Sequence, residues 1–142
     1  MILLFHGRGI SRGRGTGELL VSPAPISFLS GVDPDTGVIV EKGHPLEGES
    51  ITGRVLAFGH GKGSTVGSYV LYALSRNGKA PAAIINSKAD PIIAVGAIIG
   101  KIPMVDEPGV EIMRFRNGTC VTVDGSSGEI DYEGELLPEP GG

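Results

Sequence analysis

The segment RVLAFGHGKGSTVGSYVLYALSRNGKAPAAIIN, residues 54–86, decides the fold that we predict for this chain. Residues 54–58 and 82–86 are short apolar runs of the kind that form buried strands. Between them, apolar residues recur at the i, i+3, i+4, i+7, i+8 spacing of a helix with one apolar face: Val66, Tyr69, Val70, Ala73 and Leu74. A strand, a helix and a second strand in this order predict a βαβ unit with parallel strands.

The end of this helix is also marked in the sequence. Arg76 falls in the last turn, Gly78 has the place of a C′ residue, and Pro81 follows shortly after. The glycine loop 59–63 then lies between the carboxyl end of the first strand and the start of the helix.

The flanking regions complete an α/β fold with α+β character. Short apolar runs at 18–22 and 38–41 are separated by turn signals and predict a β-rich front. Asp90 and Pro91 predict the start of a helix that is apolar almost all round and therefore buried. Residues 118–132 alternate around a Gly/Ser turn and predict a closing hairpin. We expect one domain over 1–132 and a flexible acidic tail over 133–142.

Composition narrows the possible partners. The 142 residues carry a net charge of −4, which argues against binding to nucleic acid. A single cysteine, Cys120, excludes an internal disulfide and a self-contained zinc or iron–sulfur site. No apolar run approaches the length of a membrane span or a signal peptide, so we expect a cytoplasmic protein without a membrane partner.

The glycine loop has three possible interpretations, of which spacing removes one. A phosphate-binding P-loop needs Lys followed directly by Ser or Thr, but Gly63 separates Lys62 from Ser64. Ser64 is then either a reactive serine at a helix N-terminus, where backbone N–H groups and Lys62 favour an anion, or simply the N-cap of the helix.

Other candidate groups are weaker. His6, His44 and His60 lack the spacing of metal ligands. The glycine-rich segment 7–17 carries three arginines and fits either a solvated loop or a phosphate contact.

Four stretches together resemble the small subunit of the aconitase X family, over roughly residues 8 to 105. They are ELLVSPAPISFLSGVDPDTGVIV (18–40), HPLEGESITGRVLAF (44–58), GKGSTVGSYVLYALSRNGKAPAAIIN (61–86) and PIIAVGAIIGKIP (91–103).

The resemblance implies a swivelling β/β/α domain that works with a separate large subunit as a heterodimeric hydro-lyase. The large subunit of this family supplies a [4Fe-4S] cluster, so the resemblance implies no metal site in this chain and activity only in the pair. Its substrates are small anionic hydroxy acids. The family includes dehydratases of (R)-5-phosphomevalonate, which the resemblance favours, and of cis-3-hydroxy-L-proline.

The resemblance also assigns roles within the loop. Aconitases have a Gly-Ser-Ser-Arg loop at this turn, which makes Ser64 the proton acceptor and Thr65 the counterpart of the second serine. Val66 stands where aconitases have the arginine that binds the substrate carboxylate. The resemblance therefore implies substrate binding by Gly63 and Thr65, with Lys62, Arg14 or a residue of the large subunit in place of the arginine.

Two alternatives remain at this point. The closing hairpin also resembles the phosphohistidine swivel domain of phosphoenolpyruvate-utilising enzymes, although His60 precedes the expected position by four residues. The chain could also be a binding subunit in which the loop only caps a helix.

Overall fold

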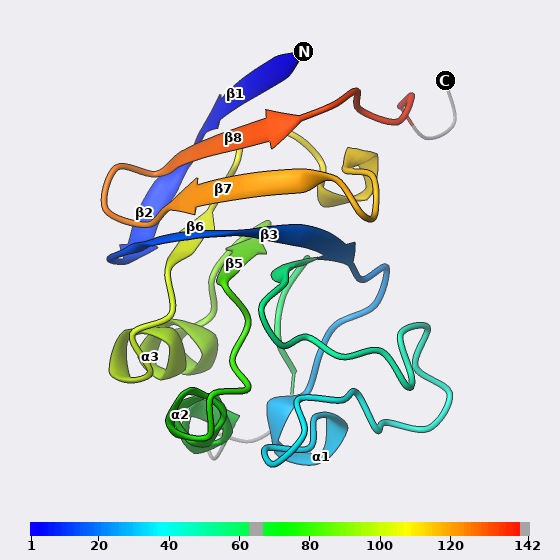
Figure 1. The fold of residues 1–142 in the computed structure, drawn as a ribbon, viewed down its shortest axis with the longest axis vertical. Coiled ribbons are helices and arrows are strands. Elements are labelled where there is room, and N and C mark those ends of the chain that lie inside the picture. The colour runs from blue at the N-terminus through cyan, green and yellow to red at the C-terminus, as the bar shows by residue number, and fades with distance from the viewer. Residues whose placement is uncertain (63–66, 140–142) are drawn as a thin grey trace.

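The computed structural model describes residues 1–62 and 67–139 (Figure 1). Its strands are β1 (Ile2–His6), β2 (Arg8–Ser11), β3 (Arg14–Val21), β4 (Val55–Phe58), β5 (Ala83–Asn86), β6 (Met104–Asp106), β7 (Cys120–Asp124) and β8 (Glu129–Glu133). Its helices are α1 (Phe28–Gly31), α2 (Gly67–Arg76), α3 (Pro91–Ile99) and the 3-10 turn η1 (Ile112–Arg114).

Within the described residues, eight strands form one sheet in the order β1-β8-β7-β3-β4-β5-β6-β2. Strands β3, β4, β5 and β6 are parallel, β7, β8 and β1 continue antiparallel from β3, and β2 is antiparallel to β6. Only Gly7 separates β1 from β2 in the chain, so one N-terminal segment provides both edges of the sheet.

The parallel strands are buried on both faces, which produces three layers. Figure 1 shows α1, α2 and α3 on one side of these strands and β7 and β8 on the other. Leu56 and Ile84 face the helices, whereas their neighbours Val55 and Ile85 belong to the core beneath β7 and β8. Alternation along a strand places successive side chains on opposite faces, so each strand contributes to both cores. The predicted β/β/α arrangement is confirmed.

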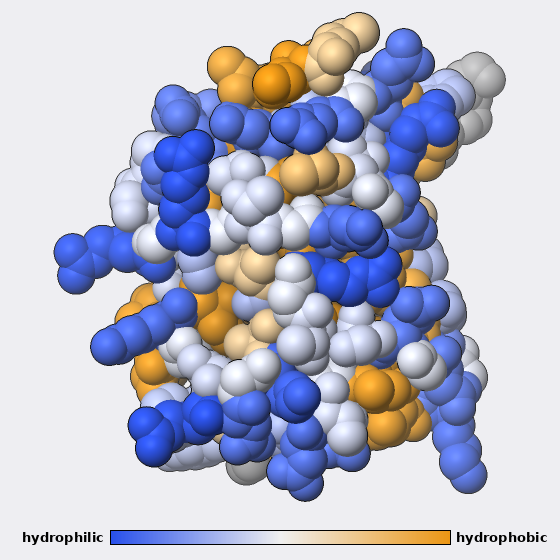
Figure 2. Space-filling view, in the orientation of Figure 1, coloured by the Kyte–Doolittle hydropathy of each residue, from blue (hydrophilic) through white to orange (hydrophobic). Residues whose placement is uncertain are grey.

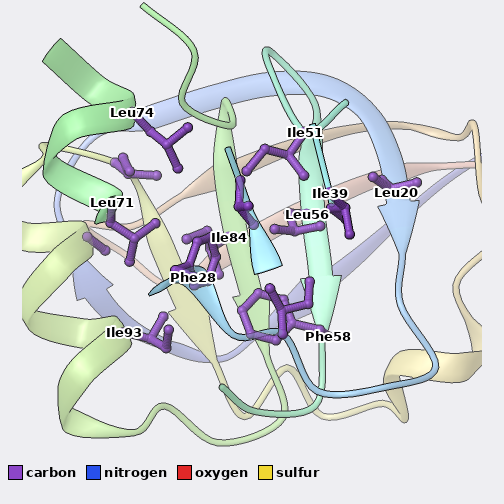
Figure 3. Packing of buried hydrophobic residues seen from close by; sticks show 14 of the residues in the cluster. Leu20, Phe28, Ile39, Ile51, Leu56, Phe58, Leu71, Leu74, Ile84 and Ile93 are labelled. Carbon is purple, nitrogen blue, oxygen red and sulfur yellow. The ribbon is translucent and has the colours of Figure 1, made fainter. Parts of the chain in front are cut away.

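The βαβ unit forms as predicted, but the buried face of α2 differs from the predicted one. Strands β4 and β5 pair in parallel. Leu71 and Leu74 are fully buried and point toward the strands in Figure 3, whereas Tyr69 is 70% exposed. Placing Tyr69 on the apolar face was therefore wrong. The helical period alone fits two overlapping stripes, and the packing of α2 against α3 selects the one that contains Leu71.

Helix α2 ends as the sequence indicates. Gly78 has a positive φ of 69°, the N–H of Lys79 donates to the carbonyl of Leu74 (2.8 Å), and the N–H of Gly78 donates to that of Ser75 (3.2 Å). This pair of bonds is a Schellman cap.

Helix α3 is not buried all round, contrary to the prediction. Ile93 and Ala97 enter the core, but Val95, Ile98 and Ile99 are each about half exposed. The helix lies in the outer layer and has the sheet on one side only, so an apolar composition does not ensure burial on every face.

The N-terminal segment that looked like a glycine-rich loop is folded into β2 and β3. Its glycines are required by close approach of neighbouring backbone. A Cβ on Gly15 would collide with the carbonyl of Ala82, and one on Gly9 would collide with that of Gly125. Glycine is normally a turn signal, but here it permits tight contacts between layers.

The predicted strand at 38–41 is absent from the described structure. Val38 and Ile39 make only isolated antiparallel bridges, to Ser50 and Val32. The closing hairpin is present, with β7 and β8 antiparallel and the Asp124 carboxylate accepting the N–H groups of Ser126 and Ser127 in the turn.

The C-terminal segment that follows β8 is attached to η1. Arg114 and Leu137 exchange two hydrogen bonds, of 2.7 and 3.0 Å, between these two parts of the chain. Flexibility over 133–142 stays a prediction, and residues 140–142 lie outside the described structure.

Figure 2 shows apolar surface at the end of the molecule where β1 lies, which agrees with the exposure of Met1, Ile2 and Leu4. No helix in the described ranges is long and apolar enough to cross a membrane.

Candidate active site

The candidate site lies at the carboxyl ends of β4 and β5, the edge at which open parallel sheets bind ligands. The loop 59–62 follows β4 directly. The carbonyl of Gly59 accepts the N–H groups of Ser87 (3.1 Å) and Lys88 (3.4 Å), just after β5. On the other side, the N–H of Lys62 donates to the carbonyl of Ile26 (3.1 Å). These contacts hold the loop between two neighbouring segments.

The predicted proton acceptor, Ser64, lies outside the described residues, as do Gly63, Thr65 and Val66. Their roles stay predictions from the sequence. What the structure describes is the loop up to Lys62 and helix α2 from Gly67 onward.

Lys62 borders a cavity of about 300 Å³ at this edge. The other lining residues are Gly61, Asp90, Pro91, Ile92 and Ile93. The wall therefore combines the cationic side chain of Lys62 and the carboxylate of Asp90 with the apolar surface at the start of α3. The Lys62 side chain and the apolar surface suit a small anion with a hydrocarbon stem.

The amine of Lys62 is already paired within the chain. Its Nζ lies 3.1 Å from Oε2 of Glu41, and both side chains are partly exposed, at 46% and 27%. A substrate anion that binds Lys62 must share it with Glu41 or displace it. Nothing in the sequence pointed to this role of Glu41, because it is the last residue of the run 38–41, which predicted a strand and is irregular in the structure.

Asp90 caps α3 as predicted and also contacts the glycine loop. Its Oδ1 accepts the N–H of Ile93 (3.0 Å) and its Oδ2 accepts the N–H of Gly61 (3.1 Å). The first contact follows from the capping pattern, whereas the second depends on the tertiary approach of the loop to the helix.

Arg14 is not brought together with Lys62. It is the first residue of β3 and pairs with Asp124, and it borders a small pocket with four other residues: Thr122, Asp124, Glu129 and Asp131. Because Val21 pairs with Ala57, the carboxyl end of β4 lies roughly 25 Å further along the strand direction than Arg14. Substrate binding by Arg14 stays a prediction, which this separation does not support.

Arg8, another cation of the N-terminal segment, forms an ion pair in which the Asp106 carboxylate is buried and the Arg8 side chain is 56% exposed. Its Nε and Nη2 donate to the two carboxylate oxygens of Asp106, at 2.8 and 2.6 Å, and Glu107 lies 3.0 Å from Nε. Burial alone would raise the pKa of Asp106, but the Arg8 guanidinium and the N–H of Ala89 outweigh it, and the pKa is lowered. Arg8 therefore joins β2 to β6.

The described residues do not fit an iron–sulfur cluster. Cys120 is exposed on β7, and partial desolvation of its thiol and the nearby carboxylates of Glu133 and Glu18 raise its pKa. No group of three or more His, Cys, Asp or Glu side chains suited to a metal occurs in the described ranges. Among the histidines, His44 is buried between the carbonyl of Pro25 and the N–H of Leu46, and His60 contacts the carbonyl of Gly61.

Comparison with known proteins agrees with this architecture. Residues 4–132 match the model of the aconitase X swivel domain. The chain is 57% identical to a protein from Methanosarcina mazei named phosphomevalonate dehydratase small subunit, with 89% of both chains covered. It is 54% identical to the protein of that name from Pyrococcus furiosus, and this match covers 92% of this chain and 97% of the relative.

A solved structure agrees with the fold. The crystal structure of Thermococcus kodakaraensis aconitase X in its holo-form superposes with a TM-score of 0.86 at 49% identity, covering 96% of this chain and 99% of the other. Family and fold are thus consistent over nearly the whole length. The chain belongs to the aconitase X swivel domain family.

Proposed function

We propose that this chain is the small subunit of a two-subunit dehydratase that converts (R)-5-phosphomevalonate to trans-anhydromevalonate 5-phosphate. The observation that supports this most strongly is identity of 54% and 57% to proteins named phosphomevalonate dehydratase small subunit, over about nine-tenths of this chain. The cavity beside Lys62 supports it further, because its cation and its apolar wall match an anionic substrate with an alkyl stem.

In the proposed reaction Ser64 acts as the general base. It removes a proton from the carbon next to the substrate carboxylate, and the electron pair of that C–H bond forms the C=C bond. The hydroxyl on the neighbouring carbon leaves with its bonding pair and takes a proton from solvent to become water, and Ser64 then releases the abstracted proton to solvent. Ser64 precedes the described start of α2 by three residues. Free N–H groups at a helix N-terminus favour the serine alkoxide and an anionic substrate alike.

The substrate is proposed to bind through Lys62 and through backbone groups of the loop, including Gly63 and Thr65. Lys62 takes one of the two anionic groups of the substrate, since the arginine that aconitases use is replaced by Val66. The remaining contacts come from the large subunit. An iron–sulfur cluster is proposed to belong to that subunit, where it would supply the Lewis acid for the departing hydroxyl.

Reconstitution of this chain with its large subunit tests the proposal. Dehydration of 5-phosphomevalonate is expected, with little turnover of cis-3-hydroxy-L-proline, and the reverse preference would show that the substrate is wrong. Ser64→Ala is expected to abolish turnover, whereas Ser126→Ala, in the hairpin turn, is expected to retain it. Wild-type turnover by Ser64→Ala would exclude the serine as the base and leave the loop as a cap.

A further inference from the structure

We propose that Asp90 is a positioning residue that sets the course of the glycine loop on which Ser64 and Lys62 lie. The inference rests on the proposed function, because the loop matters for catalysis only if its residues bind and deprotonate the substrate. It concerns a second role for a residue whose sequence pattern indicates only a helix cap.

The carboxylate of Asp90 bridges two elements that are distant in the chain. Oδ1 accepts the N–H of Ile93 (3.0 Å) in the first turn of α3, and Oδ2 accepts the N–H of Gly61 (3.1 Å), 29 residues upstream. Capping requires one side-chain oxygen, which Ser or Asn would also provide. The second oxygen of Asp90 is the one that reaches the loop.

Packing around Gly61 leaves little freedom in this contact. A Cβ at position 61 would lie 2.7 Å from Cγ1 of Ile93 and 2.8 Å from Oδ2 of Asp90, closer than carbon side chains approach such atoms. The loop backbone therefore lies directly against the start of α3, and only glycine permits the N–H of residue 61 to reach the carboxylate.

Asp90 acts together with the backbone contacts of the loop. The carbonyl of Gly59 is held by Ser87 and Lys88, and the N–H of Lys62 is held by Ile26. Asp90 holds the residue between these two points. Its contact therefore lies one residue before Lys62 and three before Ser64 in the sequence, so a change of the backbone at Gly61 is passed along the chain toward both residues.

Asp90 places a negative charge beside a cavity that we propose to bind an anion, and two hydrogen-bond donors stabilise that charge. Both oxygens of Asp90 accept backbone N–H groups, and the N-terminal field of α3 stabilises negative charge at this position. Asp90 thus acts on the backbone of the loop and not on the substrate.

The variant Asp90→Ser separates the two roles. A serine hydroxyl caps α3 by accepting the N–H of Ile93 but is too short to hold Gly61 as well. In the free chain, amide hydrogen exchange followed by NMR is expected to accelerate at Gly61 by about tenfold, while the Ile93 amide and the thermal midpoint remain close to the wild-type values.

The same variant is then assayed with the large subunit. We expect kcat to fall by about 10²-fold, the effect of displacing a reacting group by about 1 Å. The KM is expected to rise by less than the roughly tenfold increase expected for Lys62→Gln, because Lys62 keeps its charge and only its position in the loop changes. Unchanged exchange at Gly61, or wild-type kcat, would overturn the inference.

Two further variants keep the result interpretable. Gly61→Ala keeps the Asp90 carboxylate in the chain but places a Cβ against Ile93 and Oδ2 of Asp90, so the contact between the loop and α3 must shift. It is expected to lower kcat even if Asp90→Ser fails to fold, and wild-type kcat in Gly61→Ala would contradict the proposal. Ser64→Ala in the same assay reports on the base alone. If that variant is active the proposed function fails, while exchange at Gly61 still decides whether Asp90 holds the loop.

Discussion

The ammonium group of Lys62 and the carboxylate of Glu41 form an ion pair, with Nζ 3.1 Å from Oε2, that joins the glycine loop to the irregular segment after α1. Glu41 therefore occupies the cation that we propose for the substrate. An anionic substrate and Glu41 compete for one charge, which makes the pair a direct means of testing the role of Lys62.

Removal of the competing carboxylate is expected to strengthen substrate binding. Glu41→Gln should lower KM by up to about fivefold with kcat unchanged, because a partly exposed ion pair contributes roughly 0.2–1 kcal/mol. Glu49→Gln, which removes the partner of Arg54 at 3.0 Å, is the matched control and should leave KM unchanged. A higher KM in Glu41→Gln would mean that Glu41 orients Lys62 for the substrate.

Lys62 and Arg14 are both predicted to bind the substrate, but their removal should affect KM differently. Lys62→Gln is expected to raise KM at least about tenfold, since a charged hydrogen bond to the substrate contributes roughly 1.5–3 kcal/mol. Arg14→Gln should leave KM unchanged, because Arg14 lies at the opposite end of β3 from the loop. Equal increases in KM for the two variants would contradict this placement of the substrate.

The buried face of α2 can be checked by unfolding the free chain in urea. Leu71→Ala removes a fully buried side chain from the α2 and α3 interface and should cost about 2–5 kcal/mol. Tyr69→Ala, on the exposed face, should change the free energy of unfolding by less than about 0.5 kcal/mol. The opposite order would restore the stripe that the helical period suggested.

Acid stability should depend on Asp106. Because its pKa is lowered in the folded state, the unfolded chain binds more protons at low pH, so the stabilisation is complete above about pH 4 and is lost as the pH falls through the folded pKa. Asp106→Asn should flatten the pH dependence of the urea midpoint below about pH 4. Asp35→Asn, at an exposed turn, serves as the control and should retain the wild-type slope.

Several elements could be predicted because their signals are local. The Asp90-Pro91 start of α3, the Gly78 end of α2 and the hairpin turn at Asp124 all appear in the structure as their sequence patterns indicated. Each depends on hydrogen bonds within a few residues, so neighbouring residues suffice to specify it.

The errors concern features that depend on distant parts of the chain. Tyr69 and Leu71 both fit a helical stripe, and only the position of α3 selects between them. Gly9 and Gly15 have the sequence pattern of loop residues, but in the structure they lie in strands. Glycine is needed there because the carbonyls of Gly125 and Ala82 lie too close for a Cβ. Residues 38–41 have the composition of a strand, but among the described residues they form only isolated bridges and no continuous ladder.

For the candidate site, the sequence by itself determined the βαβ unit, the glycine loop at the carboxyl end of β4 and the presence of Lys62 in it, because these follow from short-range periodicity and spacing. Tertiary structure alone decided that Glu41 pairs with Lys62, that Asp90 reaches Gly61 and that Arg14 lies far away. Such pairings arise when segments separated by tens of residues are packed against one sheet, and no local pattern records which side chains will meet.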